Sequence, residues 1–295
     1  MERELAAIYD ELNRRLCEGE KTVYLTGESL AFLRNAAARK DGVPDRPEPE
    51  ESGRVEAERR TSNARAKSRD ARKDAPGVPA PPELTLPDGP REARVEFLRE
   101  RILGDQWALS QIKSGKKLVP GTGDLKARIF FCGEAPGAEE EKEGIPFVGP
   151  AGQLLSRIIK AMGLSRESVY IANIMTYRPP PPGPVGNRAP TPDEMAYCLP
   201  YLMAQLEIVQ PEVIVGLGKT ALDGLLGRDP KRRMTRVRGQ WQTFKEIPLM
   251  PTFHPSYLLR NGSLETKRLV WEDMLEVMQR LELPVSEKQR SYFQT

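Results

Sequence analysis

ARIFFCGEAPG, residues 127–137, is an apolar run that ends in a loop rich in glycine and proline. Three similar runs follow along the chain: SVYIANI at 168–174, EVIVGLG at 212–218 and IPLMPTF at 247–253. Segments of helical length separate them, and strands that are apolar throughout and alternate with helices are typical of a parallel sheet buried on both faces. The sequence therefore predicts an α/β fold, a three-layer α/β/α domain around a central four-stranded parallel sheet.

The chain before and after this region predicts three further segments. The apolar side chains of residues 2–18 fall on one helical face, so residues 1–40 are expected to form a small helical N-terminal appendage. Residues 41–90 contain no aromatic residue and are rich in proline, glycine and charge, which predicts a disordered linker. The α/β domain is then expected to span residues 91–283, with a C-terminal tail at residues 284–295.

Composition limits the class of protein. The chain has 295 residues and no apolar stretch near the ~18 residues of a membrane helix, and its charged start is unlike an export signal. Three cysteines without a CxxC pair argue against a disulfide framework or a common zinc site. We therefore expect a cytoplasmic monomer with no membrane contact. The net charge is +3, and residues 91–295 hold an excess of about 5 positive charges, which is compatible with a polyanionic partner.

In a parallel sheet, ligands bind beyond the carboxyl ends of the strands, so the residues there are the first candidates for a site. After the first run, Gly133 and Gly137 permit a tight turn and a close approach of the backbone, while Pro136 stiffens the loop. No lysine followed by serine or threonine comes after these glycines in the loop, so it is not a phosphate loop of the GxxxxGK[ST] kind. A plain turn from strand to helix explains these residues equally well.

Three side chains at or near the other strand ends suit recognition of a nucleobase. Phe147, between two stiff neighbours, offers a flat face for stacking, although it could also fill the core. Asn173 can donate and accept hydrogen bonds together, as a base edge requires, although it is also a common turn residue. His254 is the only histidine of the chain and is either a catalytic imidazole or a helix cap.

Two basic stretches could contact nucleic acid. After His254, Leu258 and Leu259 stand beside Arg260, a combination that suits a wedge into a base stack together with a grip on phosphate. The run from Arg228 to Arg238 could follow phosphates, and a solvated loop explains it equally well.

Taken together, these motifs resemble the uracil-DNA glycosylase superfamily, most closely its family 4 of bacterial and archaeal enzymes. The motifs are GEAPGAEEEKEGIPFVGPAGQLL, VYIANI, RPP with GNRAPTPDE, EVIVGLGKTAL and PTFHPSYLLR, which occur in this order within about residues 95–282. The resemblance implies that uracil, turned out of the DNA, stacks on Phe147, that Asn173 reads its edge and that His254 donates to a uracil oxygen. Four further residues would line the uracil site, namely Gly133, Ala135, Gly137 and Glu140.

The resemblance also assigns roles to the remaining candidates. Glu134 would orient the attacking water, and Glu140 would crowd the base near C5 and so exclude the methyl group of thymine. The segment after the histidine would enter the minor groove of DNA, through Ser256, Leu258, Leu259 and Arg260. One departure concerns Ala135, because the best-known enzymes of the superfamily carry an aspartate there, although family 4 also lacks it.

A second departure concerns a cofactor. Enzymes of family 4 bind a four-iron, four-sulfur cluster through four cysteines, and the matching positions here are Gly104, Trp107, Tyr177 and Cys198. One thiolate cannot hold such a cluster. We therefore expect neither an iron-sulfur centre nor another metal, with Trp107 and Tyr177 filling the space as apolar core.

The sequence thus predicts a DNA repair enzyme that flips uracil out of DNA and hydrolyses its N-glycosidic bond, leaving an abasic site. We expect no strand-cleaving lyase activity, because no lysine is among the proposed site residues. The alternative is a protein that binds uracil-containing or damaged DNA with weak turnover or none. The expected partner is uracil-containing DNA, and residues 1–40 could in addition meet a protein partner.

Overall fold

The computed structural model of the chain describes residues 77–181 and 186–294. The predicted helical appendage, and most of the predicted linker, lie outside the described residues. None of the described helices is long and apolar enough to cross a membrane.

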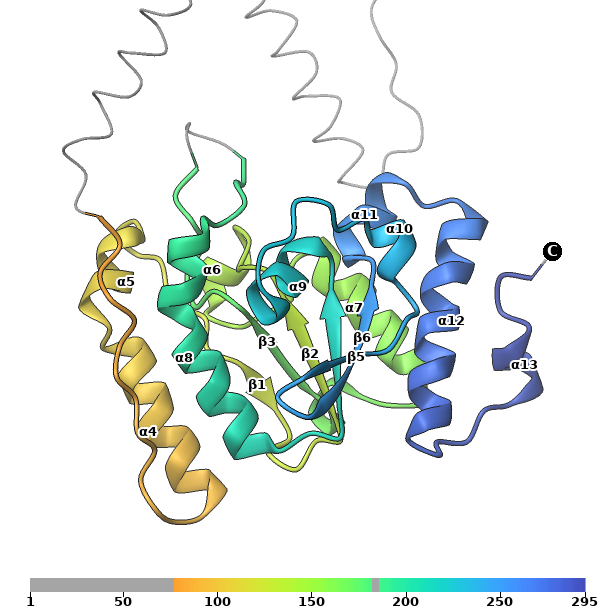
Figure 1. Cartoon of the computed structure of the whole chain (residues 1–295), viewed down its shortest axis with the longest axis horizontal. Coiled ribbons are helices and arrows are strands. Elements are labelled where there is room, and N and C mark those ends of the chain that lie inside the picture. The colour runs from red at the N-terminus through yellow and green to blue at the C-terminus, as the bar shows by residue number, and fades with distance from the viewer. Residues whose placement is uncertain (1–76, 182–185, 295) are drawn as a thin grey trace, which may run out of the picture. The chain divides into compact units, whose positions relative to one another are not determined.

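A single mixed sheet of six strands forms the centre of the described domain (Figure 1). The order across the sheet is β1-β3-β2-β4-β6-β5. The four middle strands are parallel, and the two edge strands pair antiparallel to their neighbours. The strands are β1 (Thr122–Gly123), β2 (Ile129–Gly133), β3 (Tyr170–Asn173), β4 (Val213–Leu217), β5 (Gln242–Phe244) and β6 (Ile247–Thr252).

The α/β class is confirmed, but the prediction of four strands leaves out the two edge strands. The four predicted runs form the parallel middle of the sheet. β1 and β5 have only two and three residues, which is too short for a hydrophobic period to reveal them.

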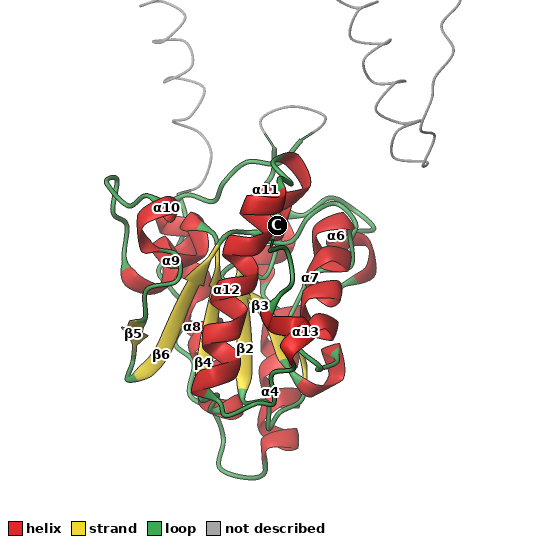
Figure 2. Ribbon diagram, turned by 90° about the vertical axis from the view of Figure 1, so that its right-hand side faces the viewer, coloured by secondary structure: helices red, strands yellow, loops and turns green. Residues whose placement is uncertain are grey.

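Helices cover both faces of the sheet, which gives the expected three layers (Figures 1 and 2). α4, α8 and α9 pack on one face, and α7 and α12 on the other. The helices are α4 (Arg91–Leu103), α5 (Gln106–Gln111), α6 (Glu140–Glu143), α7 (Pro150–Ala161), α8 (Pro192–Val209), α9 (Lys219–Leu226), α10 (Met234–Val237), α11 (Pro255–Arg260), α12 (Leu264–Arg280) and α13 (Glu287–Arg290), with a 3₁₀ turn η1 (Arg166–Ser168).

The strands divide their side chains between two apolar cores. Successive residues of a strand point to opposite faces. Phe130 therefore joins the core under α4 and α8, and Phe131 joins the core under α7 and α12; both are fully buried. Burial of such a side chain is worth about 1.5–3 kcal/mol, so these two cores fix the sheet and with it the strand ends.

Packed residues extend beyond both predicted ends of the domain. Val78, Leu84 and Leu86 pack against the core under α4 and α8. At the other end, the Trp271 indole N–H donates to the Gln289 carbonyl at 2.6 Å, which holds α13 against α12. The predicted boundaries at residues 91 and 283 therefore fall inside packed structure.

Candidate active site

A cavity of about 570 Å³ opens at the carboxyl ends of the parallel strands. The register explains why the strand ends meet there, since Gly133 of β2 lies opposite Asn173 of β3, and Leu217 of β4 lies opposite Thr252 of β6. The residues that follow β2, β4 and β6 line the cavity together with the loop after β3. The sheet thus brings together residues that are up to 126 positions apart in the chain, from Glu134 to Arg260.

Gly133 lets two of the predicted residues approach each other at the floor of the cavity. A Cβ atom at this position would overlap Asn173 Oδ1 and lie 2.5 Å from the Phe147 ring. Asn173 is 5% exposed, and its Oδ1 has no hydrogen-bond partner among the described residues. A buried acceptor without a partner is unfavourable unless a ligand completes it, so the amide is prepared for a donor in the cavity.

Phe147 is held in an uncommon backbone conformation. Its φ of 54° lies in the left-handed region, which costs a bulky residue roughly 1–2 kcal/mol. The Arg166 guanidinium donates to the Phe147 carbonyl at 2.9 Å and to the Pro146 carbonyl at 2.8 Å. The backbone of Phe147 also rests on Gly152 of α7, where any Cβ would overlap it. The phenyl ring is thereby fixed at the cavity, with its centroid 5.8 Å from that of the His254 ring.

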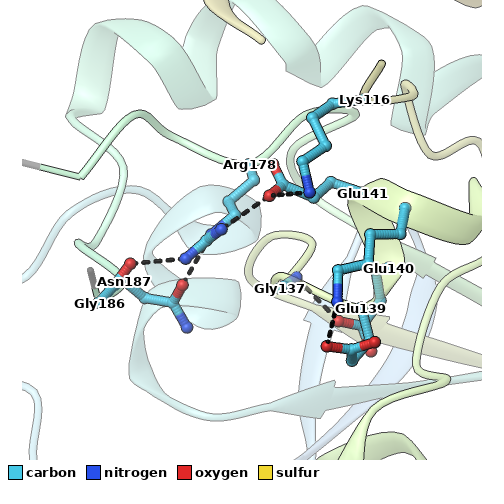
Figure 3. A network of polar contacts seen from close by, with 9 residues as sticks. Lys116, Gly137, Glu139, Glu140, Glu141, Arg178, Gly186 and Asn187 are labelled. Carbon is cyan, nitrogen blue, oxygen red and sulfur yellow. Dashed lines mark hydrogen bonds and ion pairs between the residues drawn. The ribbon is translucent and has the colours of Figure 1, made fainter. Parts of the chain in front are cut away.

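Glu140 joins two loops through backbone amides. Its Oε2 accepts from the Gly137 N–H at 3.0 Å, and its Oε1 accepts from the N–H groups of Val148 and Gly149 at 2.9 and 2.8 Å. Figure 3 shows the first of these contacts. Both carboxylate oxygens are therefore engaged in fixing the loops on either side of Phe147. Contact with C5 of a base, the role predicted from the sequence, stays a prediction.

A charged network fastens the proline-rich loop after β3 to α6 (Figure 3). The Arg178 guanidinium donates to Glu141 Oε1, to Asn187 Oδ1 and to the Gly186 carbonyl, at 2.8, 2.8 and 2.6 Å. Lys116 Nζ lies 3.3 Å from Glu141 Oε1. Arg178 and Asn187 also line the cavity, so this network shapes one of its walls. Sequence reasoning missed it, because its members are spread from residue 116 to residue 187.

His254 caps α11 and has a defined tautomer. Its Nδ1 accepts from the Ser256 backbone N–H at 3.1 Å and lies 2.8 Å from Ser256 Oγ. Because a backbone N–H can only donate, Nδ1 is the acceptor and the proton of the neutral ring is on Nε2. Burial, together with the charge of Arg260, lowers the pKa of His254 to about 4. At neutral pH the cavity therefore holds an uncharged imidazole with one N–H to donate.

Glu134 and Ala135 follow β2 directly and line the cavity. The Glu134 carbonyl accepts from the Met175 N–H at 3.1 Å, which ties this loop to the exit of β3. Burial raises the pKa of the Glu134 carboxyl, and a hydrogen bond from the Thr220 hydroxyl partly offsets this rise. A carboxyl group with a raised pKa in a cavity is suited to take up a proton.

The predicted DNA-contacting segment separates into buried and exposed side chains. Leu258 is 5% exposed and packs with Phe253 and Val270, so in this conformation it is not available to DNA. Leu259 is 49% exposed, and Arg260 is exposed next to it. Helical geometry places these neighbours on different faces of α11, which sequence order alone did not reveal.

One lysine at the cavity was also missed. Lys219 begins α9 and lines the cavity, but its Nζ donates to Asp223 Oδ2 and to the Asp229 carbonyl, both at 2.8 Å. These bonds direct the ammonium group toward the loop that follows α9.

Comparison with known proteins agrees with this geometry. The family model described as the uracil DNA glycosylase superfamily matches residues 120–275, more than half of the chain. The chain belongs to this superfamily. The matched region contains every one of the residues proposed above for the cavity and for α11.

This chain matches most of the length of several curated relatives in the superfamily. A type-4 uracil-DNA glycosylase of Thermotoga maritima is 49% identical over 187 residues, which is 62% of this chain and 93% of the relative. A type-4 enzyme of Archaeoglobus fulgidus is 41% identical, with 52% and 77% covered. A type-5 uracil-DNA glycosylase of Thermus thermophilus is 29% identical, with 63% and 88% covered.

The four positions that the resemblance matches to cluster ligands, Gly104, Trp107, Tyr177 and Cys198, lie at the end of α4, in α5, after β3 and in α8. Cys198 is the only thiol among them, and its Sγ lies 3.8 Å from Thr176 Oγ1. The Trp107 and Tyr177 rings pack edge to face, with centroids 5.5 Å apart. Both the Trp107 Nε1 and the Tyr177 hydroxyl are buried without a hydrogen-bond partner among the described residues. An indole, a phenol and a glycine cannot replace three thiolates, so these residues do not fit an iron-sulfur cluster.

A buried carboxylate holds this same corner together. Asp105 accepts from the Tyr197 hydroxyl at 2.9 Å, from the Tyr201 hydroxyl at 2.7 Å and from the Ala108 N–H at 2.9 Å. The last bond caps α5, and the two tyrosines belong to α8. Asp105 thus links the two helices that a cluster would otherwise connect.

Proposed function

We propose that this chain removes uracil from DNA by hydrolysing the N-glycosidic bond of an extruded nucleotide, leaving an abasic site for repair. The single observation that carries the proposal is the convergence of Asn173, Phe147 and His254 on one cavity at the carboxyl edge of the sheet. The type-4 and type-5 relatives that carry the name uracil-DNA glycosylase support it.

Asn173 is the group that would recognise uracil. The uracil edge presents an N3–H donor beside the O4 acceptor, and a carboxamide can meet both with its oxygen and its NH₂ group. Oδ1, which has no partner among the described residues, would accept from N3–H. Cytosine presents an acceptor at N3 and a donor at C4, so the same amide in this orientation would reject it.

Phe147 would supply the stacking surface. Turning a nucleotide out of a duplex costs a few kcal/mol, and stacking of a base on an aromatic ring returns roughly 1–3 kcal/mol. This gain requires a ring that is already in place. The bonds from Arg166 and the contact with Gly152 support such preorganisation.

His254 would stabilise the leaving uracil. As the glycosidic bond breaks, negative charge collects on the base, and the Nε2–H of the neutral ring can donate a hydrogen bond to a uracil oxygen without first taking up a second proton. A donor placed for the transition state contributes about 10²–10³-fold to the rate. Glu134 would take a proton from the attacking water, for which its raised pKa suits it.

The reaction would need no iron-sulfur cluster, because the residues at its four positions do not fit one. Lys219, the lysine at the cavity, is bonded to Asp223 and to the Asp229 carbonyl, so we expect simple hydrolysis without lyase chemistry. One copy of the chain supplies all the proposed site residues, and we expect a monomer. Free, buried Cys132 and Cys198 suit a reducing compartment such as the cytoplasm.

Release of uracil from an oligonucleotide with one uracil tests this function. We expect release by the wild type, and a loss of at least about 100-fold for His254→Ala and for Asn173→Ala. Undiminished release by both variants would overturn the site assignment. Tight binding of uracil-DNA by the wild type with no product over long incubation would instead establish the alternative, a binding protein without turnover. The lack of a cysteine at three of the four matched cluster positions and the alanine at position 135 are the observations that keep this alternative open.

A further inference from the structure

The loop between α9 and β5 contains a dense group of cations. Residues 227–238, here called the α10 loop, include six basic residues and one acid, Asp229. The basic residues are Arg228, Lys231, Arg232, Arg233, Arg236 and Arg238. The structure separates them into two groups with different surroundings.

Two of the six are used inside the protein. Arg232 pairs with Asp223 and donates to the Gly227 carbonyl at 3.0 Å. Arg238 pairs with the fully buried Asp273 and donates to the Leu269 carbonyl at 2.7 Å. Both arginines are part-buried, and their charges are matched.

The other four are exposed, and none has a carboxylate within 4.0 Å among residues 77–181 and 186–294. They are Arg228, Lys231, Arg233 and Arg236. The folding of α10 explains part of this arrangement, because Met234 and Val237 pack inward on the core. Arg233 and Arg236, each one residue earlier, are thereby directed outward and lie three residues apart on one side of the turn.

The α10 loop lies at the same edge of the sheet as the cavity. Lys219, which lines the cavity, donates to the carbonyl of Asp229 in the loop. Met234 also packs against the cluster of Phe253 and Leu258, so α10 adjoins α11, which begins next to His254. Figure 1 shows α9, α10 and α11 together at this edge.

We propose that the exposed cations of the α10 loop bind the phosphates of the DNA strand that flanks the extruded nucleotide. The inference rests on the proposed function and adds a second contact surface to it. Four unmatched charges beside a base cavity suit a polyanion, because each contact with a phosphate releases a condensed counterion. The apolar side chains of α10 point inward, so the surface lacks the anchors that a protein partner or a membrane would use.

The test measures binding of the full-length chain to a labelled duplex without uracil, from 50 to 200 mM salt. The variant is Arg233→Gln with Arg236→Gln. Each lost phosphate contact lowers the steepness of log K against log salt by about 0.9, so we expect a decrease of about 1.8. At 50 mM salt, binding should be weaker by at least about tenfold. Because the duplex contains no uracil, the result does not depend on turnover.

A matched control removes the same two charges elsewhere. Lys126 precedes β2 and Lys160 lies at the end of α7, so both are exposed at the opposite edge of the sheet. Lys126→Gln with Lys160→Gln should leave the salt dependence within experimental error of the wild type. Equal losses in both double variants, or no loss in either, would overturn the proposal.

Two further readouts separate the possible failures. Arg233→Lys with Arg236→Lys keeps the charges and should keep the steep salt dependence, and a loss there would point to misfolding or to specific geometry in place of phosphate binding. If the wild type releases no uracil while the α10-loop variant still shows the reduced steepness, the proposed function fails and the DNA surface stands. If the wild type releases uracil and the salt dependence of the α10-loop variant is as steep as that of the wild type, the proposed function stands and the DNA surface fails.

Discussion

Asn173 and Tyr177 are four residues apart at the exit of β3. The region around Asn173 agrees with the family 4 resemblance, whereas the region around Tyr177 departs from it. The cavity around Asn173 is lined by all three side chains that the resemblance assigns to stacking on the base and hydrogen bonding with it, Phe147, Asn173 and His254. The corner around Tyr177 keeps one ligand position of four. A group that touches the substrate must present particular atoms at a particular point. A group that only fixes the backbone can be replaced by another arrangement that fixes the same backbone, here the hydrogen bonds of Asp105 and the packing of Trp107.

The strongest test of the difference between the two regions is to remove one functional group from the cavity. His254→Ala should lower kcat for uracil release by at least about 100-fold, since the donor to the developing negative charge is lost. The loss of stability should be small in comparison, because the hydrogen bonds of the imidazole among the described residues are to Ser256, and the loss of such a helix cap costs about 0.5–2 kcal/mol. Single-turnover kinetics under saturating enzyme, with urea unfolding of the same sample, measure both effects. A large loss of stability with normal kcat would place His254 among the structural residues.

Gly133→Ala tests whether the cavity depends on close packing. The added Cβ would overlap Asn173 Oδ1 and press on the Phe147 ring, so we expect about a 100-fold loss of activity and a destabilisation of about 1–3 kcal/mol. Adding Phe147→Leu removes the clash with the ring and leaves the overlap with Asn173 Oδ1. The double variant should recover part of the lost stability without recovering uracil release, whereas recovery of both would mean that the phenyl ring is not needed.

The sequence revealed the parts of this site that depend on strand order. Parallel strands bring their carboxyl ends to one edge, so Gly133, Asn173 and His254 could be placed together without coordinates. It did not reveal Arg166, because nothing in the spacing of a residue 19 positions beyond Phe147 shows that its guanidinium turns back to that carbonyl. The burial of Leu258 and the two edge strands depend on packing and on very short pairings, which leave no period in the sequence.

In the corner around Tyr177, we test the comparison by removing hydrogen bonds that we regard as structural. Asp105→Ala deprives two tyrosine hydroxyls and the Ala108 N–H of their acceptor, and the loss of the cap alone costs about 0.5–2 kcal/mol. We expect a total destabilisation of about 2–4 kcal/mol in urea unfolding. The kcat of the molecules that remain folded should stay within about twofold of the wild type, and a loss as large as that of His254→Ala would mean that the corner controls the chemistry.

The pH dependence of the free energy of unfolding gives a further test, because it depends on His254 in the cavity. The pKa of His254 is about 4 in the folded chain and near 6.5 when unfolded, so below pH 6.5 the unfolded state binds a proton that the folded state does not. His254 therefore makes the fold less stable as the pH falls from 6.5 to 4, by roughly 3 kcal/mol at most. The difference in unfolding free energy between His254→Gln and the wild type, measured at pH 7 and at pH 4.5, should shift in favour of the variant at the lower pH. A difference that is constant with pH would contradict a buried neutral imidazole.

The smallest expected effect comes from the residue with which the comparison began. The Tyr177 hydroxyl is buried without a partner among the described residues, and an unsatisfied buried group lowers stability. Tyr177→Phe keeps the ring that packs on Trp107 and should stabilise the fold by about 1 kcal/mol, with uracil release unchanged. Tyr177→Ala serves as the control, since it removes the ring as well and should destabilise by about 3–5 kcal/mol. If Tyr177→Phe is instead clearly less stable, the hydroxyl is completed by a buried water, and the corner is held by a polar network in addition to its aromatic packing.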